Sequence, residues 1–126
     1  MNTPHNARHT QIWQQNVAKS STAQHDVLAK ADPKSWDIIA LQEPYLDHLG
    51  LTRANSHWTV IYPSNKNQEN QNRTRSIILI NTNIDSTQIQ QINIQSSNIT
   101  AIQISTPSRS LLLINIYNDK HEQSRH

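Results

Sequence analysis

The sequence of 126 residues contains no cysteine, no phenylalanine and only one glycine. Without cysteine, the chain has no disulfide framework, no thiolate metal site and no cysteine nucleophile. No apolar run approaches the length of a membrane-spanning helix, and residues 1–10 lack the apolar core of a secretory signal peptide. We therefore expect an intracellular protein with no membrane partner.

Charge is also scarce. Charged residues make up 16% of the chain, and the formal net charge is +2. This small excess is compatible with a nucleic-acid partner, but lysine and arginine form no run that would make a strong basic patch. An ordinary solvated surface is the alternative explanation, so charge alone does not assign a partner.

The apolar residues that are present favour packed strands. Hydrophobic residues account for 34% of the chain, and isoleucine is frequent and clustered. The length fits a single domain, which we place at residues 11–126 after a disordered lead-in at residues 1–10. The apolar fraction is low for an independent core, so we expect part of the fold to lie outside this sequence.

The order of elements predicts a mixed α/β domain. We expect a strand at 11–17, then a helix that begins at a capping pair of Ser21 and Gln24 and ends before Pro33. The nearly continuous apolar run at 36–42 is typical of a strand covered on both faces, and it completes a parallel strand–helix–strand unit. Further strands are expected at 57–62, 76–81, 89–95, 99–104 and 110–117, the last three as an antiparallel meander. One helix among many strands of mixed direction indicates an α/β sandwich.

Two polar residues close the first two predicted strands. Asn16 and Glu43 would lie at the same carboxyl edge of the sheet, where α/β folds usually bind ligands. A carboxylate there is a hard oxygen ligand for Mg²⁺ or Mn²⁺, and an asparagine can orient a phosphate or a metal-bound water. The alternative is a solvent-facing glutamate at the end of a strand.

The segments that carry this pattern resemble the opening of the endonuclease/exonuclease/phosphatase superfamily, in the form found in fungal non-LTR retrotransposon polyproteins. That family has an asparagine closing its first strand and a Gln-Glu pair closing its second. The matching segments, in order along the chain, are 13–16, 37–44, 45–47, 52–58, 73–76 and 115–119. The resemblance implies the N-terminal portion of a four-layer α/β sandwich of the DNase I-like type, truncated in this sequence. It also implies a divalent-metal-dependent phosphodiesterase: a nuclear target-DNA endonuclease with Mg²⁺ (or Mn²⁺), DNA as its partner and no small-molecule cofactor.

Carried over by position, the resemblance assigns three site residues. Asn16 would help to position the phosphate and the attacking water, Glu43 would bind the metal, and Tyr117 would lie beside the scissile phosphate. In the wider family this tyrosine is followed by a small residue and proline, whereas here it is followed by Asn118 and Asp119, which leaves the roles of both open.

Two arginines and the residue after the tyrosine are candidates for contact with DNA. Arg73 and Arg75 flank a predicted strand and would contact the DNA backbone, as would Asn118. Exposed loop charge is the alternative for both arginines. The three tryptophans would pack in the core, with stacking on a nucleobase as the alternative.

Several expected catalytic groups are absent from this sequence. The family completes its site with an Asp-x-Asn pair after the tyrosine strand and with a later Asp and His, and none of these occurs here. His5 and His9 have a spacing that would suit zinc on a helix, but the predicted lead-in contains His5. We therefore expect a fragment with little or no activity. The alternatives are a non-catalytic transposon remnant that binds nucleic acid weakly, or a member of the phosphatase branch of the same fold.

Overall fold

The computed structural model describes residues 9–66 and 74–118. Within those ranges it contains the helix α1 (Ser21–Lys30), a short 3-10 helix η3 (Ser86–Gln88), and the strands β1 (Ile12–Asn16), β2 (Ile38–Gln42), β3 (Trp58–Ile61), β4 (Ser76–Asn81), β5 (Ile89–Ile92), β6 (Ile99–Ser105) and β7 (Ser110–Ile116). No helix in the described part of the chain is long and apolar enough to cross a membrane. The lead-in predicted at residues 1–10 falls almost entirely outside the described residues.

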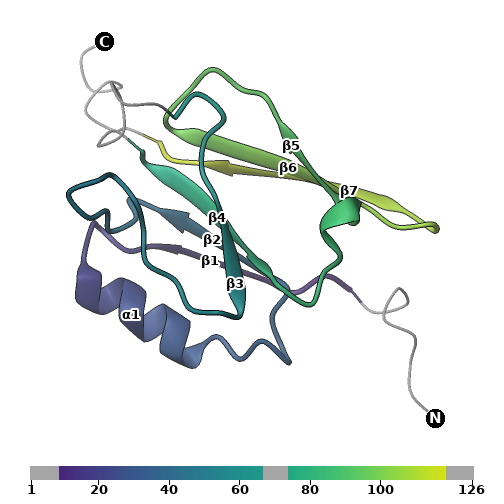
Figure 1. Cartoon of the computed structure of the whole chain (residues 1–126), viewed down its shortest axis with the longest axis horizontal. Helices are drawn as coiled ribbons and strands as arrows, with labels where there is room; N and C mark the ends of the chain where they lie inside the picture. The colour runs from purple at the N-terminus through teal and green to yellow at the C-terminus, as the bar shows by residue number, and fades with distance from the viewer. Residues whose placement is uncertain (1–8, 67–73, 119–126) are drawn as a thin grey trace.

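The first sheet has the strand order β1-β2-β4-β3. Strands β1 and β2 are parallel, with Asn16 opposite Gln42, and β4 runs antiparallel to both β2 and β3. Every residue of β2 and of β4 is buried, because α1 lies on one face of this sheet and the second sheet lies on the other (Figure 1). The parallel strand–helix–strand unit predicted from the sequence is therefore present.

Helix α1 packs its apolar face on the first sheet. Val27 and Ala31 are buried against Ile39 and Leu41 of β2. The predicted capping pair is wrong by one residue: Ser20, in extended conformation, is the N-cap, and its hydroxyl accepts a hydrogen bond from the Ala23 N–H at 3.0 Å. The two residues before Ser20, Ala18 and Lys19, are in the left-handed conformation. The turn that they form shifts the start of the helix. The helix begins at the residue that was expected to cap it.

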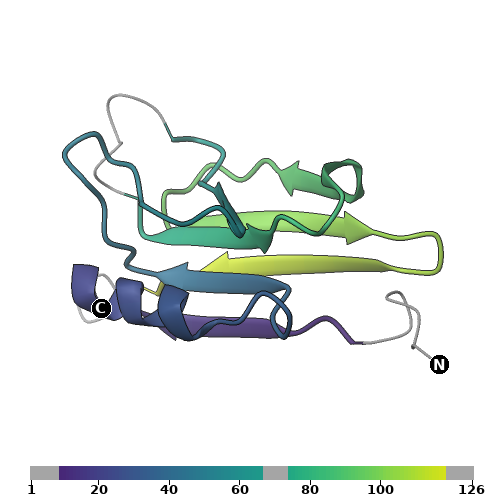
Figure 2. The same cartoon turned by 60° about the horizontal axis from the view of Figure 1, so that its bottom comes forward.

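The second sheet is the predicted antiparallel meander, with the order β5-β6-β7. Its inward side packs on the first sheet through a core of isoleucines, on the side of that sheet opposite α1 (Figure 1). Figure 2 shows the hairpin of β6 and β7 extending past the first sheet at one end. The buried residues of this core are Ile38, Ile78, Ile80, Ile102 and Ile104. Helix, sheet and sheet make three of the four layers of the expected sandwich.

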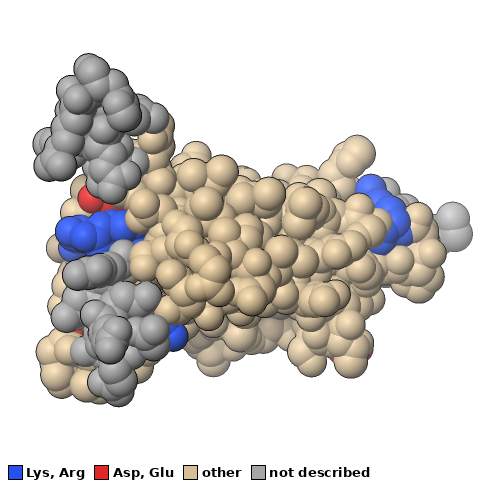
Figure 3. Space-filling model, turned by 90° about the horizontal axis from the view of Figure 1, so that it is seen from above, with Lys and Arg blue, Asp and Glu red and all other residues tan. Residues whose placement is uncertain are grey.

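The outward side of the second sheet is apolar and exposed among the described residues. Leu112, Ile114 and Ile116 of β7 are 57%, 46% and 56% exposed. Seen from above, the centre of this side of the molecule carries neither lysine or arginine nor aspartate or glutamate, and the basic side chains lie toward its ends (Figure 3). A surface of this kind favours contact with other apolar protein surface and not with the DNA backbone.

Most predicted strands are one or two residues longer than the observed ones, and two further differences have a local cause. Strand β5 ends at Ile92 and not at Gln95, because the Ile94 N–H leaves the ladder and donates to the Ser64 hydroxyl at 2.9 Å. The 3-10 helix at Ser86–Gln88 was not predicted, and it begins where the Asp85 carboxylate accepts the Thr87 N–H at 3.0 Å. Both differences result from hydrogen bonds between a backbone N–H and a side chain, which the apolar periodicity of a strand does not predict.

Candidate functional site

Backbone hydrogen bonds join several segments at one end of the sheets. The Lys19 N–H donates to the Glu43 carbonyl at 2.7 Å, and the Glu43 N–H donates to the Arg75 carbonyl at 2.8 Å. The Arg75 N–H in turn donates to the Ser97 carbonyl at 2.9 Å. The chain after β1, the chain after β2, the start of β4 and the loop before β6 therefore meet at this end.

The end of β7 joins the same group of segments. The Tyr117 N–H donates to the Asn98 carbonyl at 2.8 Å, one residue beyond the carbonyl that binds Arg75. Tyr117 is half-buried and Asn118 is exposed. By the alternation of a strand, Tyr117 continues the inward row of Leu113 and Asn115, toward the first sheet. The structure thus brings Tyr117 to the end of the sandwich that holds Glu43 and Arg75, whereas Arg73 lies outside the described residues.

Glu43 has an unusual backbone conformation. Its φ angle is 50°, a left-handed value that is sterically costly for any residue with a Cβ atom. The side chain is half-buried, and the following Pro44 is fully buried. The two backbone hydrogen bonds of Glu43 hold it in place, and such over-determined strain is typical of functional positions.

Asn16 closes β1 at the same edge as Glu43. Its side chain is exposed, and its Oδ1 atom accepts a hydrogen bond from the Ala18 N–H at 2.8 Å. Ala18 and Lys19 both have left-handed φ angles, of 53° and 59°. The Asn16 Oδ1 atom is thus engaged in the turn, and within the described residues the Nδ2 group makes no hydrogen bond. That group is a donor suited to a phosphate oxygen.

The buried side chain of Gln24 fixes the loop that leaves Glu43. Its Oε1 atom accepts the Tyr45 N–H at 2.9 Å, and its Nε2 atom donates to the Thr52 hydroxyl at 3.0 Å. The Thr52 N–H donates to the phenol oxygen of Tyr62 at 2.9 Å. Burial is the main reason that the pKa of Tyr62 is raised above its ordinary value. Tyr62 is therefore neutral at physiological pH and serves as a fixed acceptor.

A metal at this end would have few protein ligands among the described residues. No group of three or more His, Cys, Asp and Glu side chains there is arranged to hold an ion. A Mg²⁺ ion nevertheless needs only one or two carboxylates when substrate phosphate and water complete its shell, so Glu43 fits such an ion. His5, one half of the zinc alternative, lies outside the described residues.

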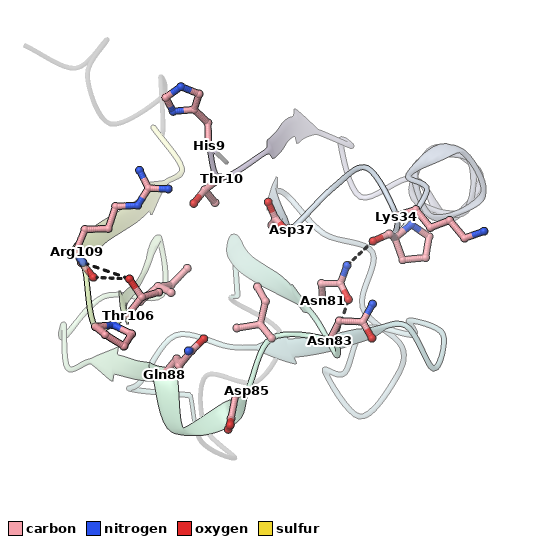
Figure 4. Close-up of a pocket in the computed structure, with 14 residues that line it drawn as sticks. His9, Thr10, Lys34, Asp37, Asn81, Asn83, Asp85, Gln88, Thr106 and Arg109 are labelled. Atoms are coloured by element: carbon pink, nitrogen blue, oxygen red, sulfur yellow. Dashed lines mark hydrogen bonds between the residues drawn. The ribbon is translucent and has the colours of Figure 1, made fainter. Parts of the chain in front are cut away.

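A pocket with a volume of about 750 Å³ opens at the other end of the sheets. Figure 4 shows Asp37, Asn81 and Arg109 around it, with Lys34 extending away. The amide of Asn81 donates to the carbonyls of Pro33 and of Trp36 at 2.7 and 2.9 Å. The Asp37 carboxylate accepts the Gln11 N–H at 2.8 Å. These buried polar groups hold the turn before β2, so the pocket is not the candidate site.

The three tryptophans lie around the helix-side core. Trp58 is 4% exposed, and Trp13 and Trp36 pack edge to face with ring centroids 5.2 Å apart. All three contact the cluster between α1 and the first sheet. Their predicted packing in the core is confirmed.

Sequence reasoning missed three side-chain amides beneath the candidate site, of which two are buried and the third, Gln14, is exposed. Gln14, Gln42 and Asn115 form a continuous hydrogen-bonded chain across three strands. The signal that would have found Asn115 is a polar residue on the inward row of an otherwise apolar strand. From the sequence alone, Gln42 was assigned only a place in the Gln-Glu pair that closes the second strand, and no role of its own.

Two facing sheets with a helix on the outside form part of a DNase I-like α/β sandwich. The solved endonuclease domain of TRAS1, a telomere-specific non-LTR retrotransposon, has a similar structure, with a TM-score of 0.65 and 18% sequence identity. The match covers 88% of this chain and 45% of the TRAS1 domain chain, so this chain spans less than half of that domain. No protein-family profile and no curated protein matches the sequence. The predicted fold class is confirmed, and so is the resemblance to a retrotransposon endonuclease domain at the level of the fold.

Proposed function

We propose that this chain is part of a divalent-metal-dependent phosphodiesterase of the retrotransposon target-DNA endonuclease type. The observation that supports this most is the meeting of Asn16, Glu43 and Tyr117 at one end of a DNase I-like sandwich. These residues lie at or directly after the ends of three strands, β1, β2 and β7. The substrate would be genomic DNA, which implies work in the nucleus beside a reverse transcriptase encoded in the same element.

Glu43 would hold the metal, Mg²⁺ or Mn²⁺. The ion would polarise a phosphate oxygen and stabilise the charge that develops when the phosphodiester is cleaved. The exposed Nδ2 group of Asn16 would donate to a phosphate oxygen, and Tyr117 would orient the same phosphate from the second sheet. The role of the chain's own residues is therefore to bind the phosphodiester and keep it oriented between the two sheets.

Positive charge near the site would assist DNA binding. Arg75 is half-buried beside Glu43 through their shared backbone hydrogen bond, and the net charge of the chain is +2. Arg75, Asn118 and Arg73 would contact the DNA backbone, which confers affinity without sequence preference. Such binding weakens steeply as salt increases.

The chain by itself is proposed to have little or no nuclease activity. The Asp-x-Asn pair and the later Asp and His that the resemblance leads us to expect, which would take a proton from an attacking water, do not occur in this sequence. The remaining half of the fold would supply those groups and would also cover the apolar outward side of the second sheet. A non-catalytic remnant with at most weak nucleic-acid binding is the second candidate, favoured by the lack of a group of three metal-ligating side chains among the described residues.

Two measurements on the purified chain test these proposals. Addition of Mn²⁺ should broaden the NMR amide signal of Glu43, and the broadening should disappear in Glu43→Gln. The matched control is Asp85→Asn, which removes an exposed carboxylate near the pocket at the other end and should leave the broadening unchanged. Absence of broadening in the wild-type chain would reject the metal role.

The second measurement is plasmid nicking in the presence of Mg²⁺. We expect salt-dependent DNA binding and no nicking above background. Nicking that Glu43→Gln abolishes would overturn the proposed inactivity while supporting the metal role. DNA binding without any Mn²⁺ effect at Glu43 would favour the non-catalytic remnant.

A further inference from the structure

A chain of three side-chain amides connects the two sheets directly beneath the candidate site. The side-chain amide of Gln14 on β1 donates to Gln42 Oε1 on β2, and Gln42 Nε2 donates to Asn115 Oδ1 on β7. Gln42 is 7% exposed and Asn115 is 3% exposed, so two of the three amides are buried. The chain therefore runs from the edge of the first sheet through its centre and into the second.

The hydrogen bonds around Asn115 allow only one orientation of this chain. Its Nδ2 group donates to the Leu41 carbonyl at 2.9 Å and to the Ile77 carbonyl at 2.8 Å. With both amide protons bound to β2 and β4, only Oδ1 is left to accept from Gln42. Gln42 must then present its nitrogen to Asn115 and its oxygen to Gln14. The hydrogen bonds therefore fix the orientation of each of the three amides, and an apolar side chain of the same volume would not be oriented in this way.

Two hydroxyl groups extend the contact between the sheets. Ser76 of β4 donates to the Asn115 backbone carbonyl at 2.7 Å, and Thr100 of β6 donates to the Ser76 carbonyl at 2.8 Å. Both residues are fully buried. Asn115 is thus held by its side chain and by its backbone, whereas Thr100 bonds outside the amide chain and offers a matched control.

Each amide lies just before one candidate site residue in the sequence. Gln14 precedes Asn16 by two residues, and Gln42 directly precedes Glu43. Asn115 precedes Tyr117 by two residues, again on the same side of its strand. A shift of any amide would therefore move the adjacent site residue.

We propose that Gln42 is a positioning residue, which through Gln14 and Asn115 sets the distance between Asn16, Glu43 and Tyr117 across the two sheets. The catalytic significance of this inference rests on the proposed function. The claim that Gln42 sets the distances between these three residues does not depend on whether Glu43 binds a metal. Without the central amide, the isoleucine core would still join the sheets. The core has no directional bonds, so the sheets would settle in a different relative position at this end.

The test compares three variants by NMR amide shifts and by urea unfolding. Gln42→Met keeps a similar volume and removes both bonds of the central amide. Gln14→Met removes one bond at the exposed rim, so it leaves the buried core untouched. Thr100→Val removes a buried hydrogen bond outside the amide chain while retaining the side-chain shape.

Gln42→Met should shift the amide signals of all three site residues, including Asn16 and Tyr117, which do not adjoin it in sequence. Gln14→Met should also shift Tyr117, which follows β7 of the other sheet. Thr100→Val should lower stability and leave Asn16 and Glu43 in place. If Gln42→Met unfolds the chain, the positioning role is tested by Gln14→Met alone: a shift of the Tyr117 amide signal supports it, and no shift contradicts it.

Two outcomes would overturn the inference. In one, Gln42→Met and Gln14→Met shift only their sequence neighbours. In the other, Thr100→Val moves the three site residues as much as Gln42→Met does. If Mn²⁺ broadens no signal in the wild-type chain, the metal role is rejected. The positioning role is tested separately, by the amide shifts of the three variants.

Discussion

Replacement of Glu43 by glycine should stabilise the fold while removing the proposed metal ligand. The φ angle of Glu43 is 50°, a conformation that costs a residue with a Cβ atom about 1–2 kcal/mol. Glycine relieves this strain but loses about 0.4–1 kcal/mol through the greater freedom of the unfolded chain. The expected net gain is about 0.5–1 kcal/mol, which raises the melting temperature of a chain this long by about 2–4 °C.

The matched control is Glu43→Ala, which removes the same carboxylate and retains the strain. Thermal unfolding followed by circular dichroism at pH 7 should show no gain for alanine and a gain for glycine. Lys19→Gly, at a φ angle of 59°, should gain a similar amount without loss of the Mn²⁺ effect. If Glu43→Gly is no more stable than Glu43→Ala, the argument that strain is stored at this position is wrong.

Three further changes test other parts of the structure. Gln24→Met should cost about 2 kcal/mol in urea unfolding, because it leaves the Tyr45 N–H without its partner; a change near zero would contradict the anchoring role. Ile114→Lys, on the exposed apolar side, should reduce self-association in light scattering and change stability by less than about 0.5 kcal/mol. Chiefly the backbone hydrogen bond from Leu51 lowers the pKa of Asp47, so this carboxylate stabilises the fold above its unfolded pKa of 3.8. That contribution is lost as the pH falls through the lowered pKa, and an NMR titration should show a midpoint below 3.8, whereas Asp47→Asn should remove this acid dependence.

The amino-acid sequence determined most of the architecture, because the strongest signals were long and periodic. The apolar run before Glu43 favoured a strand covered on both faces, and its order after β1 and α1 indicated a parallel pair. The strand at 76–81 was predicted with both of its ends, since polar residues flank a continuous run of isoleucine and leucine. The resemblance carried by the residue order also proposed Asn16, Glu43 and Tyr117 as candidate site residues, and their roles stay predictions.

Local hydrogen bonds decided the ends of elements, and these were less predictable. Ser20 and Ser21 are equally good capping residues, and only the left-handed turn at Ala18 and Lys19 selects Ser20. The φ angle of Glu43 has no signal in the sequence, because it results from bonds to Lys19 and Arg75, which are remote along the chain. Strain of this kind is imposed by neighbours and not by the residue itself.

The sequence by itself therefore determined which side chains are available and which strands carry them. Only the tertiary structure decided that Gln14, Gln42 and Asn115 meet, because their strands belong to different sheets and more than 70 residues separate the last two. A polar residue on a strand shows its function only when its partner is known. That partner is selected by the packing of one sheet on the other, which places Glu43 and Tyr117 at the same end of the sandwich.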